Sequence, residues 1–218
     1  ADGVAKNQPA KLAAMEGHYD SLAAADMYIL GWVDHESQEV TGIKVPNGLS
    51  FLIHQDFDAP VIGLNHFPKE DIPGQVNAVF QFYHLMVAIG MTLIGLTLLG
   101  AFLWWRGKLF DHKWYLQIMV AAVLLPQIAN QAGWFAAEMG RQPWVVYGLL
   151  RTSDALSKVV TANQVVFSLV LFTLIYILLF TLFVYLLNKK IKHGPEDGEM
   201  IDQRPKQKEM VEALNSHS

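Results

Sequence analysis

Three long apolar stretches dominate the second half of the chain and predict membrane-spanning helices. The first runs from about residue 80 to 105 without a lysine, arginine or acidic residue, the second from about 114 to 136, and the third from about 164 to 187. Each is long enough to cross the ~30 Å hydrocarbon layer as an α-helix. The pattern therefore predicts an all-α integral membrane protein with about three transmembrane helices.

The region before the first span, residues 1–79, is more polar and predicts a small water-exposed module. Pro9 can open a short helix and Gly17 can end it. Two strand-like runs at 27–33 and 40–45, joined by a polar segment, favour a β-hairpin. The module is thus expected to contain one short helix and one hairpin.

Positive charge predicts how the spans are oriented. Lysine and arginine residues cluster after the first span and after the third: Arg106, Lys108, Lys113, Lys189, Lys190 and Lys192. Because such clusters face the cytoplasm, residues 1–79 and the loop 137–163 are expected outside. The polar tail, residues 188–218, is expected to be cytoplasmic and disordered.

Composition narrows the possible functions. The chain has 218 residues, of which 52% are hydrophobic and 17% charged, with a net charge of −4. This balance fits a membrane domain with polar appendages and gives no support for nucleic-acid binding. The lack of cysteine excludes disulfides, thiolate metal sites and cysteine nucleophiles. The chain opens at Ala1 without an initiator methionine or signal peptide, which suggests a fragment, a processed chain or one half of a split subunit.

A polar stripe marks the second span. Gln127, Gln131, Trp134 and Glu138 recur at helical spacing on one face, and Arg141 follows one turn later. Such a stripe must turn toward protein, water or a cofactor, because hydrocarbon offers no hydrogen-bond partner. The residues alone leave two interpretations open, an ion pair between Glu138 and Arg141 or a functional carboxylate.

Three motifs occur in order along the chain: Lys-Leu-Ala-Ala-Met-Glu at 11–16, Tyr-His-Leu-Met-Val at 83–87, and Gly-Arg-Gln-Pro-Trp at 140–144, shortly after Glu138. Together they resemble subunit I of the cytochrome bd quinol oxidases, bacterial terminal oxidases that reduce oxygen to water. The resemblance runs to the end of the third span and covers the carboxy-terminal half of that subunit, in its short quinol-loop form. It implies a multi-pass protein of the bacterial cell (inner) membrane.

The resemblance implies that Met86 and Glu138 are axial haem ligands. Met86 would hold the low-spin haem b, whose potential thioether ligation raises. Taken alone, a methionine in an apolar helix is usually core filler. Glu138 would hold one of two high-spin haems, a second haem b and the chlorin haem d, for which a hard carboxylate is a suitable ligand. The implied haem environment comprises Trp134, Arg141, Gln142 and Trp144.

Lys11 and Glu16 match the pair that the family uses to bind and oxidise quinol. A carboxylate can accept a quinol proton and a cation can hold a head-group oxygen. Five residues apart, the two lie ~140° apart on a helix and are expected to flank one ligand. Without the resemblance, this motif would be read as an ordinary solvated helix.

The implied function is oxidation of quinol on the outer side, with electrons passing through haem b to the high-spin pair, where O2 is reduced and membrane potential is generated. The implied partners are the amino-terminal half of the subunit with its histidine ligands, subunit II, a small accessory subunit, ubiquinol or menaquinol, and lipid. Two alternatives are a non-catalytic membrane subunit and a proton or ion transporter that uses Glu138 and Arg141.

Overall fold

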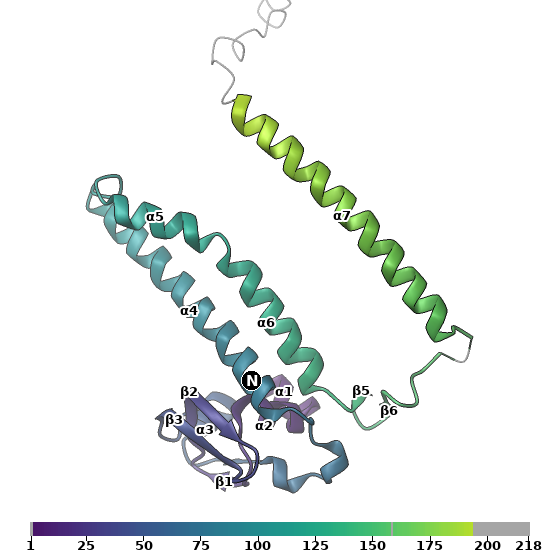
Figure 1. Cartoon of the computed structure of the whole chain (residues 1–218). Coiled ribbons are helices and arrows are strands. Elements are labelled where there is room, and N and C mark those ends of the chain that lie inside the picture. Colours follow the sequence, from purple (N-terminus) through teal and green to yellow (C-terminus); the bar gives the residue numbers. More distant parts are fainter. Residues whose placement is uncertain (1, 158, 194–218) are drawn as a thin grey trace, which may run out of the picture. The chain divides into compact units, whose positions relative to one another are not determined.

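A computed structural model describes residues 2–157 and 159–193 (Figure 1). The chain divides into two compact units, Ala1–Leu156 and Ser157–Ser218. Three helical stretches are long and apolar enough to cross a membrane, judged by length and composition: Lys69–Trp105, Lys113–Gly140 and Ala162–His193. The prediction of a mostly helical membrane protein with three spans is therefore confirmed.

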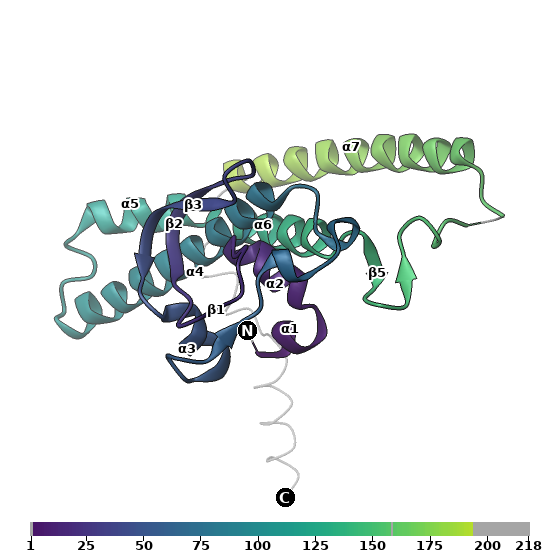
Figure 2. The same ribbon diagram turned by 90° about the horizontal axis from the view of Figure 1, so that it is seen from below.

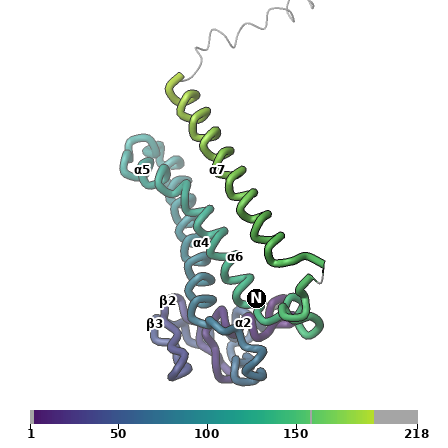
Figure 3. Tube along the Cα trace, turned by 45° about the vertical axis from the view of Figure 1, so that its right-hand side comes forward, coloured from purple at the N-terminus to yellow at the C-terminus, as the bar shows by residue number. Residues whose placement is uncertain are grey.

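Two helices of the first unit, α4 (Val76–Trp105) and α6 (Leu125–Gly140), pack side by side (Figure 3). The buried residues of α6 are Ala132, Ala136 and Gly140. Their spacing of four places them on one face of the helix, and small residues let two membrane helices approach closely. The buried part of α6 is therefore made of small residues, Phe135 stacks beside them on Phe82 of α4, and the polar stripe lies elsewhere on the helix.

The second predicted span is broken rather than continuous. It consists of α5 (Lys113–Ala122) and α6, and the break lies just before Pro126. Proline has no N–H, and its ring clashes with the carbonyl four residues earlier, here that of Ala122. The two amides between the helices instead bond to carbonyls three residues back, at 3.4 and 3.3 Å. The predicted helix over 114–136 is thus corrected to two helices that end at Gly140.

The short helix and the hairpin of the amino-terminal module are both present. Helix α2 (Pro9–Glu16) has proline in its first turn and ends at Gly17, whose φ of 65° is the left-handed conformation that glycine adopts readily. Strands β2 (Met27–Asp34) and β3 (Glu39–Val45) pair antiparallel. Both sequence predictions for this module are confirmed.

Several short elements were not predicted. They are α1 (Asp2–Asn7), β1 (Leu22–Ala23), α3 (Gly48–His54), β4 (Pro60–Val61), η1 (Leu64–His66), η2 (Lys69–Asp71), β5 (Trp144–Val146) and β6 (Leu150–Arg151). Strand β1 pairs with β4 and β5 pairs with β6. None is longer than seven residues, so each is too short to show a hydrophobic period.

The core of the first unit joins the amino-terminal module to the first span. Helix α2 contacts both α4 and α6, and β2 contacts the beginning of α4 (Figure 2). Gln81 of α4 donates to the Gly31 carbonyl at 2.7 Å, and Asn77 accepts a bond from the Val33 amide at 3.1 Å. The buried core here consists of Ala13, Ala14, Tyr19, Val33, Leu64, Val76, Val79 and Phe80. The module therefore packs directly against α4 and shares a core with it.

The second unit contains one long helix, α7 (Ala162–His193), in which no described residue is buried. An apolar helix of this kind is built to lie in lipid or against other protein. It begins near the predicted start but runs six residues past the predicted end at 187, through the lysine cluster. Residues 188–193 of the predicted tail are thus helical, and 194–218 lie outside the described residues.

Candidate functional site

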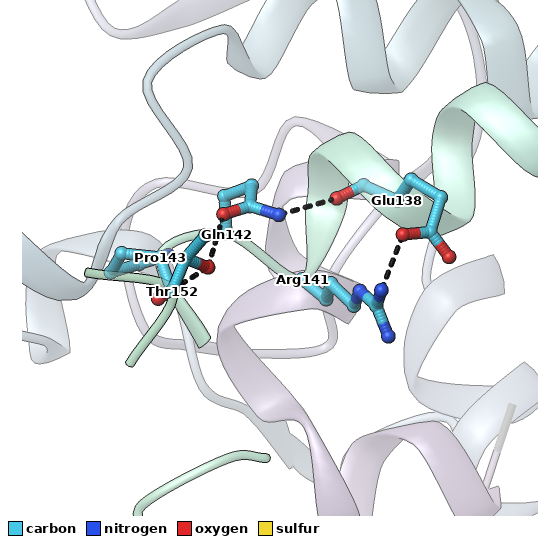
Figure 4. A network of polar contacts seen from close by, with 5 residues as sticks. All are labelled: Glu138, Arg141, Gln142, Pro143 and Thr152. Atoms are coloured by element: carbon cyan, nitrogen blue, oxygen red, sulfur yellow. Dashed lines mark hydrogen bonds and ion pairs between the residues drawn. The ribbon is translucent and has the colours of Figure 1, made fainter. Parts of the chain in front are cut away.

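The last turn of α6 carries an ion pair (Figure 4). Arg141 Nη2 donates to Glu138 Oε2 at 2.5 Å. Their side chains are 36% and 37% exposed, and Glu138 Oε1 has no hydrogen-bond partner in the described part of the chain. The ion-pair interpretation is therefore realised, and it still leaves one carboxylate oxygen free to act as a ligand.

Gln142 links the end of α6 to the loop that follows. Its Nε2 donates to the Glu138 carbonyl at 3.3 Å, and its Oε1 accepts a bond from Thr152 Oγ1 at 2.7 Å (Figure 4). The Thr152 amide donates to the Pro143 carbonyl at 2.8 Å. These contacts fix the backbone at Glu138, so Gln142 holds the helix end in place.

Trp144 lies under the Arg151 guanidinium and lines a small cavity together with Arg141. The Arg151 guanidinium lies 4.8 Å from the Trp144 ring centroid and donates to Asp71 Oδ1 at 2.7 Å. Among the described residues, the indole Nε1 of Trp144 and the Nε of Arg141 are both buried without a hydrogen-bond partner. Buried N–H groups normally have partners, so these two donors are suited to an acceptor from outside the chain, such as a carboxylate.

Lys11 belongs to the same cluster. It lines a small cavity of about 10 Å³ together with Gly140, Arg141 and Trp144. The Lys11 side chain lies close to α6, because a Cβ built at Gly140 would be 3.2 Å from Lys11 Cγ. Burial and the neighbouring Arg141 charge lower the pKa of Lys11, and the Glu138 carboxylate partly offsets them.

Glu16 lies at a different cavity. Its side chain is 3% exposed, and it lines a space of about 260 Å³ together with Tyr83, His84 and apolar residues of β2 and α4. Burial raises the pKa of Glu16 to about 7, against a smaller lowering by a hydrogen bond from Tyr83. Lys11 and Glu16 are therefore not brought to one cavity, because α2 contacts both α4 and α6 and its two faces meet different neighbours.

Met86 and His84 lie on α4. Met86 is half-buried, and a Cβ built at Gly133 of α6 would lie 2.6 Å from its sulfur. His84 is buried, with Nδ1 2.9 Å from the Phe80 carbonyl and Nε2 2.7 Å from the Tyr28 carbonyl. The two ring nitrogens of His84 are thus occupied by backbone, whereas the Met86 thioether lies between the two spans.

The polar stripe of the second span faces away from α4. Trp134 is 57% exposed, and Gln127, Asn130 and Gln131 are also exposed. Amides at membrane depth need hydrogen-bond partners. The groups that cover this stripe must therefore come from outside the described residues.

Sequence reasoning missed three residues of these sites, Tyr83, Asp71 and Arg151. Tyr83 stood inside a motif, but nothing local connects it with Glu16, which is 67 positions earlier. Asp71 and Arg151 are 80 residues apart. Their pairing depends on the tertiary fold, and periodicity carries no signal for it.

The fold and these sites define a membrane-spanning helical protein with a charged cluster at the carboxy-terminal end of α6. Residues 1–195 match the family described as cytochrome bd terminal oxidase subunit I. The chain belongs to this family. Its membership confirms the resemblance that the three motifs indicated.

Known relatives agree with this assignment. Cytochrome bd ubiquinol oxidase subunit 1 of Bacillus subtilis (strain 168) is 37% identical over 206 residues, which cover 90% of this chain and 44% of the relative. Cytochrome bd-II ubiquinol oxidase subunit 1 of Escherichia coli (strain K12) is 27% identical over 272 residues, covering 94% and 52%. The solved structure of bd oxidase from Geobacillus thermodenitrificans matches with a TM-score of 0.70 and 32% identity, covering 88% of this chain and 44% of that chain. The chain thus spans about half the length of its relatives.

Proposed function

We propose that this chain forms the quinol-binding and part of the haem-binding region of a bacterial respiratory quinol oxidase of the cytochrome bd type. One observation carries the proposal: residues of all three sequence motifs meet at α6. Lys11 packs against Gly140 beside Arg141, and the Met86 sulfur packs against Gly133. Side chains that serve only for packing are not expected to combine a carboxylate, two cations and a thioether along one membrane helix.

Haem fits the side chains at the end of α6. Glu138 would hold a high-spin haem through Oε1, since carboxylates are hard oxygen donors. Arg141 Nε and Trp144 Nε1 are buried donors without partners, suited to a haem propionate. Met86 would hold the low-spin haem b, and Trp134 would pack beside the high-spin group. When bound, the haems, two of type b and one haem d, supply electron transfer and oxygen reduction.

Glu16 is the residue best suited to accept a proton from quinol. It is buried beside a cavity, and its pKa of about 7 lets the carboxyl both take up and release a proton near neutral pH. Lys11 contributes positive charge beside Arg141 and Glu138. Quinol, either ubiquinol or menaquinol, is thus oxidised at the outer module, and its electrons cross to the oxygen-reducing site.

The working protein is proposed to be a complex in the bacterial cell membrane. The exposed stripe on α6 and the exposed surface of α7 are the faces that the amino-terminal half of the subunit, subunit II, an accessory subunit and lipid would cover. The lysines at the end of α7 favour a cytoplasmic location for that end, with residues 1–79 outside. Proton release outside and uptake inside would then generate membrane potential.

Replacing Glu138 by alanine tests the haem assignment. The measurement is the reduced-minus-oxidised optical spectrum of the purified complex, with haem content determined per protein. We expect the high-spin signal to be lost while the low-spin b signal remains. The matched control is Glu70→Ala, which removes an acidic side chain at an exposed position outside α6 and should leave both signals unchanged.

Two other outcomes would favour the alternatives. Unchanged haem content with lower thermal stability in Glu138→Ala would mean that the ion pair with Arg141 only supports packing, as in a non-catalytic membrane subunit. A native complex that carries no haem but moves protons or ions would instead support a transporter. The break in the second span gives that alternative one feature in its favour.

A further inference from the structure

A cavity lies beside Glu16, lined by residues of β2 and α4. Its volume is about 260 Å³, near the lower limit of ~300–1,000 Å³ typical of ligand pockets. Most of its lining is apolar, including Met27, Leu30 and Met91. A space of this size and character suits a flat aromatic ring with polar substituents better than a long chain.

Glu16 offers this cavity a polar atom that is open to a ligand. His84 also lines it, but the two ring nitrogens of His84 lie 2.9 and 2.7 Å from backbone carbonyls of α4 and β2. Glu16 Oε2 is buried without a hydrogen-bond partner among the described residues. Tyr83 lines the same cavity, and its hydroxyl interacts favourably with the Glu16 carboxylate, which lowers the pKa of Glu16. Glu16 Oε2 is thus open to a ligand at a cavity that Tyr83 also lines.

We propose that Tyr83 is a positioning residue for quinol oxidation, holding the Glu16 carboxyl so that its free Oε2 meets a hydroxyl of the quinol ring in this cavity. The proposal rests on the proposed oxidase function and deepens it. It also divides the roles of the motif at residues 11–16, because Lys11 lies at the Arg141 cavity and not at this one.

The chemistry balances with the groups at hand. Oxidation of a quinol to a quinone releases two protons and two electrons; the electrons leave to the haem acceptors of the proposed oxidase. One proton passes from the ring hydroxyl to Glu16 Oε2, and the other leaves to the outer water. The hydrogen bond from Tyr83 stabilises the carboxylate form of Glu16, opposing the effect of burial. Beside Glu16, the titratable groups lining the cavity in the described chain are Tyr28, Tyr83 and His84.

The test is Tyr83→Phe in the purified complex, which removes the hydroxyl and keeps the ring. Rates are normalised to haem content, so partial loss of assembled protein does not affect the comparison. We expect kcat/KM for quinol to fall about tenfold, as for the loss of one hydrogen bond to a charged group. The acidic limb of the pH–rate profile should move to higher pH, because Glu16 loses a bond that favours its charged form.

The matched control is Tyr115→Phe, which also removes a tyrosine hydroxyl that donates a hydrogen bond, at 2.9 Å to the Leu96 carbonyl on α4. This site is outside the cavity, and quinol kinetics should stay at the wild-type value. Oxygen consumption driven by an artificial one-electron donor should be unchanged in Tyr83→Phe, since no quinol proton is transferred.

The outcomes separate this inference from the proposed function. Wild-type quinol kinetics and pH profile in Tyr83→Phe, with Glu16→Gln inactive toward quinol, would overturn the role of Tyr83 and leave the oxidase assignment standing. Wild-type quinol oxidation in Glu16→Gln would overturn the quinol site itself. A loss of activity with the artificial donor as well would place the defect at the haems and also overturn the positioning role.

Discussion

Replacing Glu16 by glutamine removes a charge that the fold buries at a cost. The side chain is 3% exposed, and burial raises its pKa from 4.5 to about 7. At ~1.36 kcal/mol per pH unit, that rise corresponds to about 3 kcal/mol of ionisation cost in the folded protein. Glutamine has nearly the same shape and can still accept the bond from Tyr83, so the substitution isolates the charge.

The sign of the effect follows from proton binding. Between pH 4.5 and about 7 the folded protein keeps a proton on Glu16 that the unfolded chain has lost. Stability therefore falls as pH rises through this window and levels off above it. Glu16→Gln has no such pH-dependent loss of stability. Its free energy of unfolding should therefore equal that of the wild type, apart from a constant offset, near pH 4.5 and exceed it by about 3 kcal/mol by pH 8.

Thermal unfolding of the purified complex at pH 5 and pH 8 is the assay. We expect the difference in Tm between Glu16→Gln and wild type to grow by several degrees from the lower to the higher pH. Glu39→Gln, at an exposed position of the hairpin, controls for the loss of an acidic charge. An equal Tm difference at both pH values would refute the reasoning that burial, rather than shape, sets the cost of Glu16.

Two further predictions concern packing. Arg151→Met removes the 2.7 Å ion pair with Asp71 and the cation–π contact, and should lower the unfolding free energy by about 1 kcal/mol; an unchanged Tm in low salt would contradict this. Gly140→Val should destabilise the complex by about 2 kcal/mol, because a Cβ there lies 3.1 Å from Val79. Gly95→Val is its control, since a Cβ at Gly95 meets no described atom within 4 Å, and equal Tm values for the two variants would argue against the close packing.

The sequence predicted those parts of the fold that local chemistry determines. The spans followed from length and hydropathy, and the short helix followed from Pro9 and Gly17, which bound it in the structure. The break in the second span was not predicted, although Pro126 was visible. Proline is tolerated within membrane helices when freed carbonyls find other partners, so its presence alone does not decide between a kink and a break.

The site was less predictable, because helical spacing gives directions and not neighbours. Spacing put Lys11 and Glu16 on different sides of one helix, but it could not show which elements each side would meet; the two residues line different cavities. The structure packs α2 against both α4 and α6. Each residue therefore meets its own set of partners, and Tyr83 enters the site from 67 positions away.

The exposed stripe on α6 extends this argument beyond the chain. Its small residues are buried against α4, whereas its large and polar side chains, Trp134 and Gln131 among them, are exposed at membrane depth. A helix that only packed in lipid would present the opposite pattern, with apolar residues outward and polar ones inward. The second span thus has a polar face that a further protein or cofactor could cover, and Glu138 lies near the carboxy-terminal end of α6. A bound cofactor and a partner protein would together account for the exposed polar stripe of α6 and for the carboxylate oxygen of Glu138 that the ion pair leaves free.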